Sequence, residues 1–136
     1  MNRARAGLEE PFLPYPTGDA VARARELVLG GERVRVVEAG QASGDPVLLL
    51  HGWGASAYSF RWLLPVLARE GFRAIAPDLR GHGWSAKPVA PDAYTASAMV
   101  GWVRALLDAL GVGRALIVGQ SLGGAIALDA SIALPD

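Results

Sequence analysis

The stretch Leu-Ile-Val-Gly-Gln-Ser-Leu-Gly-Gly, residues 116–124, carries the side chain with the most specific chemistry, the hydroxyl of Ser121. An apolar run followed by Gly-x-Ser-x-Gly predicts a strand, a sharp turn and the start of a helix. Such a turn needs Gly119 and Gly123, because the backbones cross closely there, and it holds the serine in a strained conformation. This strand and helix context favours a nucleophile at Ser121 over an ordinary turn.

A serine hydroxyl attacks a carbonyl only when a general base takes its proton, and that base is usually a histidine. The sequence contains two histidines, His51 and His82, and both precede Ser121. For His51 we expect a hydrogen-bonding task that holds its loop. A base at His82 would sit on a crowded glycine turn, so we treat a minimal hydrolase that uses His82 as the less favoured alternative.

The string His51-Gly-Trp-Gly follows an apolar run and predicts a loop that folds back over the end of a buried strand. Gly52 and Gly54 permit that fold, so the backbone amide of Trp53 can point at the oxyanion formed when a carbonyl is attacked. The free amide of Leu122, at the N-terminus of the helix after the serine, can meet the same oxyanion.

The string Pro-Asp-Leu-Arg-Gly-His-Gly-Trp-Ser forms another turn of defined shape, because Gly81 and Gly83 bracket His82. Asp78 and Arg80 are close enough in the sequence to pair, which would make the segment structural. A catalytic triad that joins Asp78 or His82 to Ser121 is allowed in principle, since triads are recognised by their geometry rather than by their order in the sequence. We favour the structural role.

The elements that must position these residues follow an α/β pattern. Two alternating runs joined by Gly30-Gly31 predict a hairpin. Continuous apolar runs predict strands buried in a parallel sheet, and apolar residues at helical spacing predict amphipathic helices. The hairpin strands are expected at 25–29 and 32–38, the buried strands at 46–50, 74–77 and 115–118, and the helices at 58–69, 95–110 and 122–134. This order implies a sheet with flanking helices and right-handed crossovers.

Composition narrows the function classes. The formal net charge is zero and half of the 136 residues are hydrophobic, at 51%. No basic stripe is present, so we expect no nucleic-acid partner, and no apolar run is long enough for a membrane span. The sequence has no cysteine, which excludes a thiol nucleophile and suits a cytoplasmic protein. The histidine spacing gives no metal motif, and no P-loop or dinucleotide fingerprint is present.

Together the three strings resemble the α/β-hydrolase fold family over residues 25–134, because each follows a predicted strand in the family's order. The resemblance implies Ser121 as nucleophile and the amides of Trp53 and Leu122 as the oxyanion hole, with no cofactor and no metal. A serine nucleophile implies esterases, lipases and related enzymes that attack a carbonyl of a small-molecule substrate. Epoxide hydrolases and dehalogenases are disfavoured, because in the family they carry aspartate at that position.

The resemblance also implies that the triad acid and histidine follow the nucleophile in the chain. We therefore expect residues 25–136 to be an incomplete α/β-hydrolase domain, an N-terminal half without the later strands and lid, preceded by an extended lead-in at 1–24. The strand at 115–118 would be an unpaired edge that favours self-association. The alternative is a short, non-catalytic protein that either binds a small ligand or depends on a partner chain.

Overall fold

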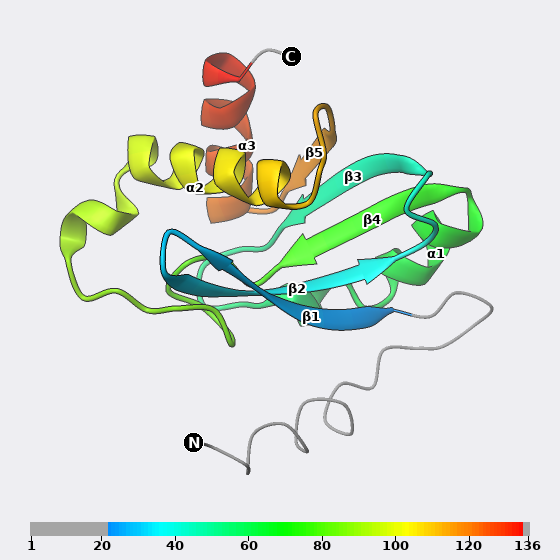
Figure 1. Ribbon diagram of the computed structural model, residues 1–136, viewed down its shortest axis with the longest axis horizontal. Helices are drawn as coiled ribbons and strands as arrows, with labels where there is room; N and C mark the ends of the chain where they lie inside the picture. The colour runs from blue at the N-terminus through cyan, green and yellow to red at the C-terminus, as the bar shows by residue number, and fades with distance from the viewer. Residues whose placement is uncertain (1–21, 135–136) are drawn as a thin grey trace, which may run out of the picture.

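The computed structural model describes residues 22–134, which fold around one five-stranded mixed sheet of order β1-β2-β4-β3-β5 (Figure 1). The predicted α/β architecture is confirmed. The lead-in expected at 1–24 falls almost entirely outside the described residues, and the first strand begins at Arg23. The strands are β1 (Arg23–Leu29), β2 (Glu32–Ala39), β3 (Asp45–Leu50), β4 (Phe72–Pro77) and β5 (Leu116–Gly119). The helices are η1 (Ala57–Phe60), α1 (Leu63–Arg69), η2 (Pro91–Tyr94), α2 (Ala96–Ala109) and α3 (Leu122–Ala133).

The predicted hairpin is present as β1 and β2, paired antiparallel through Gly30-Gly31. Both glycines have positive φ, at 55° and 86°, which the two-residue turn between the strands requires. Strand β2 also pairs antiparallel with β4 and so joins the hairpin to the rest of the sheet.

Strand β3 lies parallel to both β4 and β5. The carboxyl ends of these three strands therefore meet at one edge of the sheet, where the loops that follow them come together. Each of the three motifs follows one of these strands, so the fold gathers them into one region.

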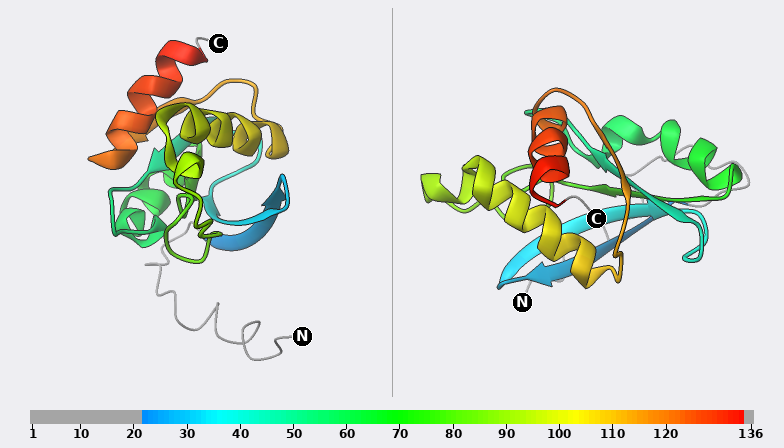
Figure 2. Two further views of the ribbon diagram at one scale, coloured as in Figure 1. Left: turned by 90° about the vertical axis from the view of Figure 1, so that its left-hand side faces the viewer. Right: turned by 90° about the horizontal axis from the view of Figure 1, so that it is seen from above.

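Helices cover both faces of the sheet (Figures 1 and 2). Helices α2 and α3 pack on one face, over a core that includes Val36, Leu48 and Ile75. Helix α1 packs on the other face, where Val37, Leu49 and Leu64 form a second core. Apolar side chains point both ways from β3, which explains why its sequence is a continuous apolar run rather than an alternation.

The helix predicted over 58–69 is divided in the structure. A short 3-10 turn, η1, covers Ala57–Phe60, and the α-helix begins only at Leu63, with Pro65 in its first turn. Proline is tolerated there, because the amide it lacks has no partner within a helix at that position. The helix predicted over 95–110 is confirmed as α2, which Thr95 caps by accepting from the amide of Ala98 at 3.2 Å.

Strand β5 pairs only with β3 and forms one edge of the sheet, so the expectation that it is buried is wrong. Leu116 and Val118 are 63% and 39% exposed. Helix α3 also presents apolar side chains to solvent, with Leu128 and Ile132 at 67% and 80% exposed. Both the edge strand and this helix therefore present apolar side chains that no element among residues 22–134 covers.

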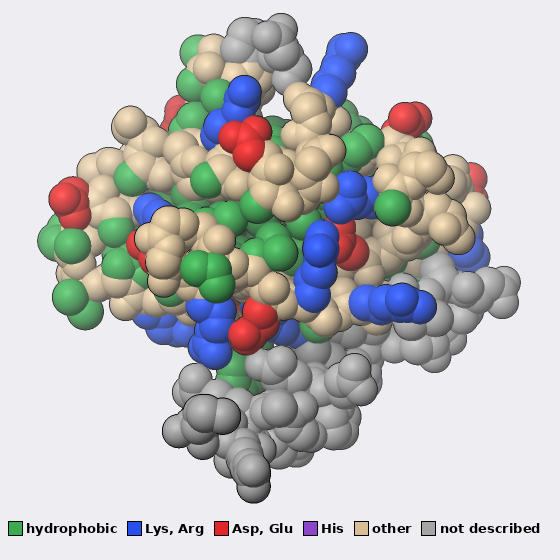
Figure 3. Space-filling model, viewed as in Figure 1, with side chains coloured by type: hydrophobic (Ala, Val, Ile, Leu, Met, Phe, Trp, Pro, Cys, Tyr) green, Lys and Arg blue, Asp and Glu red, His purple; other side chains and the backbone are tan. Residues whose placement is uncertain are grey.

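Charged side chains of both signs are interspersed over the face drawn in Figure 3. Among residues 22–134, no helix is long and apolar enough to cross a membrane.

Candidate active site

Ser121 lies at the turn from β5 into α3. Its φ of 53° and ψ of −116° fall in a region that side-chain-bearing residues rarely adopt, and no other non-glycine residue in 22–134 has a positive φ. A Cβ added to Gly123 would overlap the carbonyl of Leu50, and one added to Gly119 would overlap the carbonyl of Gly123. The glycines therefore let strand and helix cross closely, as predicted, and the strain falls on the serine.

The Ser121 hydroxyl is exposed and does not cap α3, although the residue occupies the N-cap position. Amides at the start of a helix have no acceptor within it. The amide of Gly123 instead donates to the carbonyl of Gln120 at 2.9 Å, and the amide of Ala125 donates to the carbonyl of Ser121 at 3.0 Å. The Leu122 amide finds no acceptor in the described part of the chain, so it is free beside the hydroxyl.

The loop after β3 lies against this turn. The amide of Gln120 donates to the carbonyl of Leu50 at 3.0 Å, which joins the turn to the end of β3. A Cβ placed on Gly52 would come within 3.5 Å of both the Ser121 Cβ and the Gln120 carbonyl oxygen. The peptide that carries the Trp53 amide therefore lies next to the serine, and this amide donates to no acceptor within 22–134.

His51 is fully buried, and both of its ring nitrogens are occupied. Nε2 accepts from the amide of Leu79 at 2.9 Å, and Nδ1 lies 2.7 Å from the carbonyl oxygen of Gly52. Burial lowers the pKa of His51 below its ordinary value of 6.5, with a smaller contribution in the same direction from the His82 ring. The side chain is therefore a neutral tether between two loops, the task expected from the sequence.

Asp78 is fully buried and holds three segments together. Its carboxylate accepts from the amides of Ala57 at 2.8 Å and Trp84 at 2.9 Å, and it lies 3.4 Å from the guanidinium of Arg35. The expected pair with Arg80 is wrong. The buried guanidinium of Arg35, on β2, lies beside the Asp78 carboxylate, whereas the Arg80 side chain reaches other partners.

Arg80 pairs instead with Glu32 of β2 at 2.8 Å and donates to the carbonyl of Ala93 at 2.9 Å. Gly83 leaves room for the carboxylate, because a Cβ there would overlap Asp78, and Gly81 leaves room for the ring of Tyr94. The segment is structural, as expected, through different partners.

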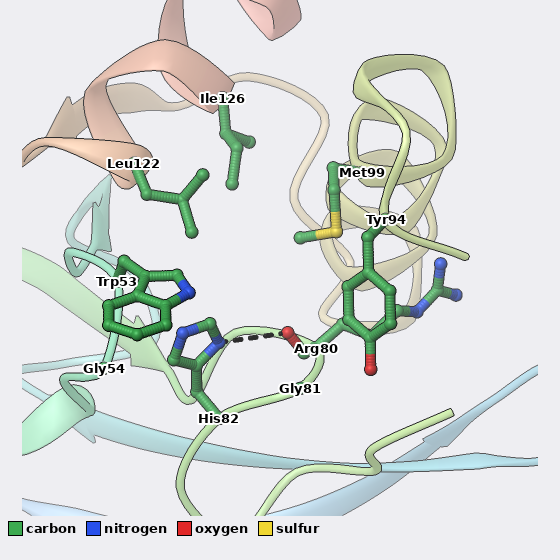
Figure 4. Close-up of a pocket in the computed structure, with 9 residues that line it drawn as sticks. All are labelled: Trp53, Gly54, Arg80, Gly81, His82, Tyr94, Met99, Leu122 and Ile126. Carbon is green, nitrogen blue, oxygen red and sulfur yellow. Dashed lines mark hydrogen bonds between the residues drawn. The ribbon is translucent and has the colours of Figure 1, made fainter. Parts of the chain in front are cut away.

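A pocket of about 520 Å³ opens beside the two free amides. His82 lies on its wall near Trp53, and Leu122 forms another side (Figure 4). The His82 Nδ1 lies 3.1 Å from the Arg80 carbonyl oxygen, which can only accept, so Nδ1 is the donor of this hydrogen bond. The rest of the lining is mostly apolar and comes from α2, α3 and the preceding turns: Gly54, Arg80, Gly81, Tyr94, Met99 and Ile126.

The structure thus brings together the predicted residues Ser121, Trp53 and Leu122 and keeps Asp78 apart in a buried ion pair. Sequence reasoning missed Tyr94, Met99 and Ile126 as pocket-lining residues. Met99 belongs to the apolar stripe of its helix, which gives no sign that one end of the stripe lines a pocket rather than the core. No group of three or more metal-ligating side chains occurs within residues 22–134.

The family model for the alpha/beta hydrolase fold matches residues 45–136. The chain belongs to the α/β-hydrolase fold family. Epoxide hydrolase A of Mycobacterium tuberculosis is 40% identical over 102 residues, which cover 75% of this chain and 32% of the relative. A haloalkane dehalogenase of Psychrobacter cryohalolentis is 39% identical over 104 residues, covering 76% of this chain and 34% of that protein.

A solved structure, an epoxide hydrolase from an endophytic Streptomyces, superposes with a TM-score of 0.80 at 44% identity. The match covers 85% of this chain and 34% of that chain. The chain therefore spans about a third of the length of the family members it matches. What these relatives do is carried out by proteins that are considerably longer.

Proposed function

We propose that this chain is part of a serine hydrolase in which Ser121 attacks an ester-like carbonyl. The observation that carries the proposal is the strained Ser121 turn, with the amides of Leu122 and Trp53 free on either side. Backbone strain on this scale, about 1–3 kcal/mol, is commonly retained where a side chain must be presented for chemistry. The adjacent apolar pocket supports a small-molecule substrate.

The proposed reaction is acyl transfer to the serine followed by hydrolysis. The Ser121 oxygen bonds to the carbonyl carbon while its proton passes to a base, and the two amides stabilise the resulting oxyanion. The base then returns this proton to the leaving oxygen. The intermediate expels a neutral alcohol and leaves an ester on the serine. Water then attacks this ester, releases the acid and restores the hydroxyl.

We propose that the general base is a histidine outside these 136 residues. His51 cannot take a proton without breaking its bond to the Leu79 amide, and the acid Asp78 is already committed to Arg35. His82 uses Nδ1 for the Arg80 carbonyl, and its ring lines the pocket, so it is the remaining candidate within these residues. The His82→Gln variant decides between them, because a base at His82 would be lost with it.

Epoxide opening is a second candidate, favoured by the identity to the epoxide hydrolases. That reaction needs a nucleophile that is anionic at neutral pH, a condition met by a carboxylate with a pKa of about 3.9 but not by an unassisted hydroxyl. Its developing charge lies on an alkoxide rather than on a tetrahedral carbonyl adduct. Serine at position 121 therefore favours ester chemistry.

A fluorophosphonate probe tests the proposal, because it forms a covalent bond only with an activated serine hydroxyl. In the full protein, which includes the proposed base, we expect labelling at Ser121 and ester hydrolysis, and we expect both to be lost in the Ser121→Ala variant. Turnover of an aryl epoxide that survives Ser121→Ala would contradict the proposal. A full protein that is correctly folded and yet unlabelled would favour the alternative, a non-catalytic protein that binds a ligand or depends on a partner chain.

We further propose a cytoplasmic location. The absence of cysteine from all 136 residues supports it, since disulfides are typical of oxidising compartments.

A further inference from the structure

The His51 ring has one defined protonation state in this fold. The amide of Leu79 can only donate, so Nε2, at 2.9 Å, must accept and carries no proton. A neutral imidazole then holds its proton on Nδ1. That proton is donated to the carbonyl oxygen of Gly52, at 2.7 Å. The ring therefore joins the β4 turn to one particular peptide unit of the loop after β3.

The carbonyl of Gly52 and the amide of Trp53 belong to the same peptide unit. No cis peptide occurs among the described residues, so the carbonyl and the N–H point in opposite directions across one plane. Fixing the direction of the carbonyl therefore fixes the direction of the Trp53 amide. A hydrogen bond to the carbonyl also polarises the peptide, which strengthens the N–H as a donor.

This peptide needs an external restraint. Glycines stand at 52 and 54, and Gly54 adopts a positive φ of 71° with nothing within 4 Å of its Cβ position. The Gly52 carbonyl also accepts from the amide of Ala55 at 3.2 Å, a bond within the loop itself. Among the described residues, His51 supplies the side-chain hydrogen bond to this carbonyl, and its bond to the Leu79 amide joins the loop to the turn after β4.

We propose that His51 is a positioning residue that aims the Trp53 amide at the oxyanion. The proposal rests on the proposed function, since it assumes that Ser121 forms that oxyanion. The proximity of Gly52 to Ser121 supports it, because the restrained peptide lies where the new charge would develop.

Two variants separate the orientation of the Gly52–Trp53 peptide from the stability that His51 gives to the loops. In His51→Gln the side-chain oxygen can reach the place of Nε2 and accept from Leu79, but the donor to Gly52 is lost. In His51→Asn the side-chain amide can replace Nδ1–H and donate to Gly52, but the acceptor for Leu79 is lost. His51→Gln therefore keeps the hydrogen bond to the Leu79 amide and loses the one to the Gly52 carbonyl, and His51→Asn does the reverse.

The experiment measures the fluorophosphonate labelling rate of Ser121 and the urea midpoint of unfolding in the full protein, which includes the proposed base outside these 136 residues. We expect His51→Gln to label about 100-fold more slowly, the loss typical of one oxyanion donor, with a midpoint near that of the unmodified chain. We expect His51→Asn to restore most of the labelling rate while its midpoint falls. Labelling rates that simply follow the midpoints in both variants would overturn the proposal.

Nitrogen NMR of the His51 ring separates failure of this proposal from failure of the proposed function. An unmodified full protein that is folded but unlabelled would contradict the proposed activation of Ser121. The ring proton on Nδ1, with a Trp53 amide signal that shifts in His51→Gln and not in His51→Asn, would still support the aiming. A proton on Nε2, or an unmoved Trp53 signal, would overturn it whatever the labelling shows.

Discussion

Buried polar side chains, rather than apolar ones, hold the loops of the site in place. Asp78 is the clearest case, since its carboxylate receives two loop amides and the guanidinium of Arg35 with no exposure to solvent. The Arg35 Nη2 finds no hydrogen-bond partner within residues 22–134, so Asp78 is the counter-charge on which this buried cation depends. Removing the charge would leave both the cation and the amides poorly satisfied.

The Asp78→Asn variant should therefore lower the free energy of unfolding by about 3–5 kcal/mol, the typical effect of breaking a buried ion pair. Urea unfolding measures the change. Asp108→Asn is the matched control, because Asp108 pairs with Arg104 at 3.3 Å on the exposed side of α2. An exposed pair of this kind contributes below about 1 kcal/mol. Equal losses in both variants would refute the role given to Asp78.

His51 should make stability depend on pH. Burial lowers its pKa in the fold below 6.5, whereas the unfolded chain retains the ordinary value. Below pH 6.5 the unfolded state therefore binds more protons than the folded state. The contribution of neutral His51 to the free energy of unfolding is present above that pH and is lost as the pH falls. The nearby His82 ring, 5.2 Å away between centroids, also disfavours the cation, and Asp78 opposes it.

The measurement is urea unfolding at pH 7.5 and pH 5.5 for the unmodified chain and His51→Gln. We expect the variant to lose less stability on acidification. His82→Gln is the control for the second imidazole. If His82→Gln reduced the loss of stability on acidification more than His51→Gln did, the pH dependence would belong to His82 and the prediction would be wrong.

The crossing of β5 and α3 depends on absent side chains. Gly123→Ala would drive a methyl group into the carbonyl of Leu50, a backbone atom in the centre of the sheet, and we expect the variant to be strongly destabilised or unfolded. Gly101→Ala is the control, because this exposed glycine of α2 has nothing within 4 Å of its Cβ position. It should raise the free energy of unfolding by about 0.5–1 kcal/mol. Circular dichroism during thermal melting checks both.

The sequence predicted the elements well where one local pattern decides them. The hairpin follows from Gly30-Gly31 between alternating runs, and α2 follows from its apolar stripe. Side-chain partners that depend on tertiary distance were not predictable in this way. Arg80 is near Asp78 in sequence but reaches Glu32, which the fold brings alongside from the hairpin.

The pocket was also beyond sequence reasoning. The three motifs predicted that Ser121, Trp53 and Leu122 would meet, because strands of a parallel sheet end at one edge. The wall contributed by Met99 and Ile126 depends on how α2 packs against α3. Apolar periodicity shows which face of a helix turns inward, but it does not show whether that face packs against other side chains or lines a pocket.

The molecule as a whole has two unequal sheet edges. Strand β1 carries Arg23, Arg25 and Glu26 in its first four positions, and such residues discourage pairing with another chain. Strand β5 carries none and continues into the exposed apolar side chains of α3. We propose that the 136-residue chain associates with itself through the β5 edge.

Sedimentation velocity at increasing concentration tests this, and we expect species larger than the 14.2 kDa monomer. Val118→Lys places a charge on the apolar edge and should shift the distribution toward monomer. Val28→Lys is the matched control, because Val28 is 71% exposed on the opposite edge strand. A monodisperse monomer at all concentrations would show that the edge does not pair.

The positive φ of Ser121 also bears on how such a protein would evolve in the laboratory. Glycine adopts that backbone conformation without the steric cost that a Cβ imposes, so the fold itself has no preference for serine there. A library screened only for heat resistance would tend to replace the one hydroxyl on which the proposed chemistry depends. Thermostability and activity would need to be selected together, because at this position they favour different amino acids.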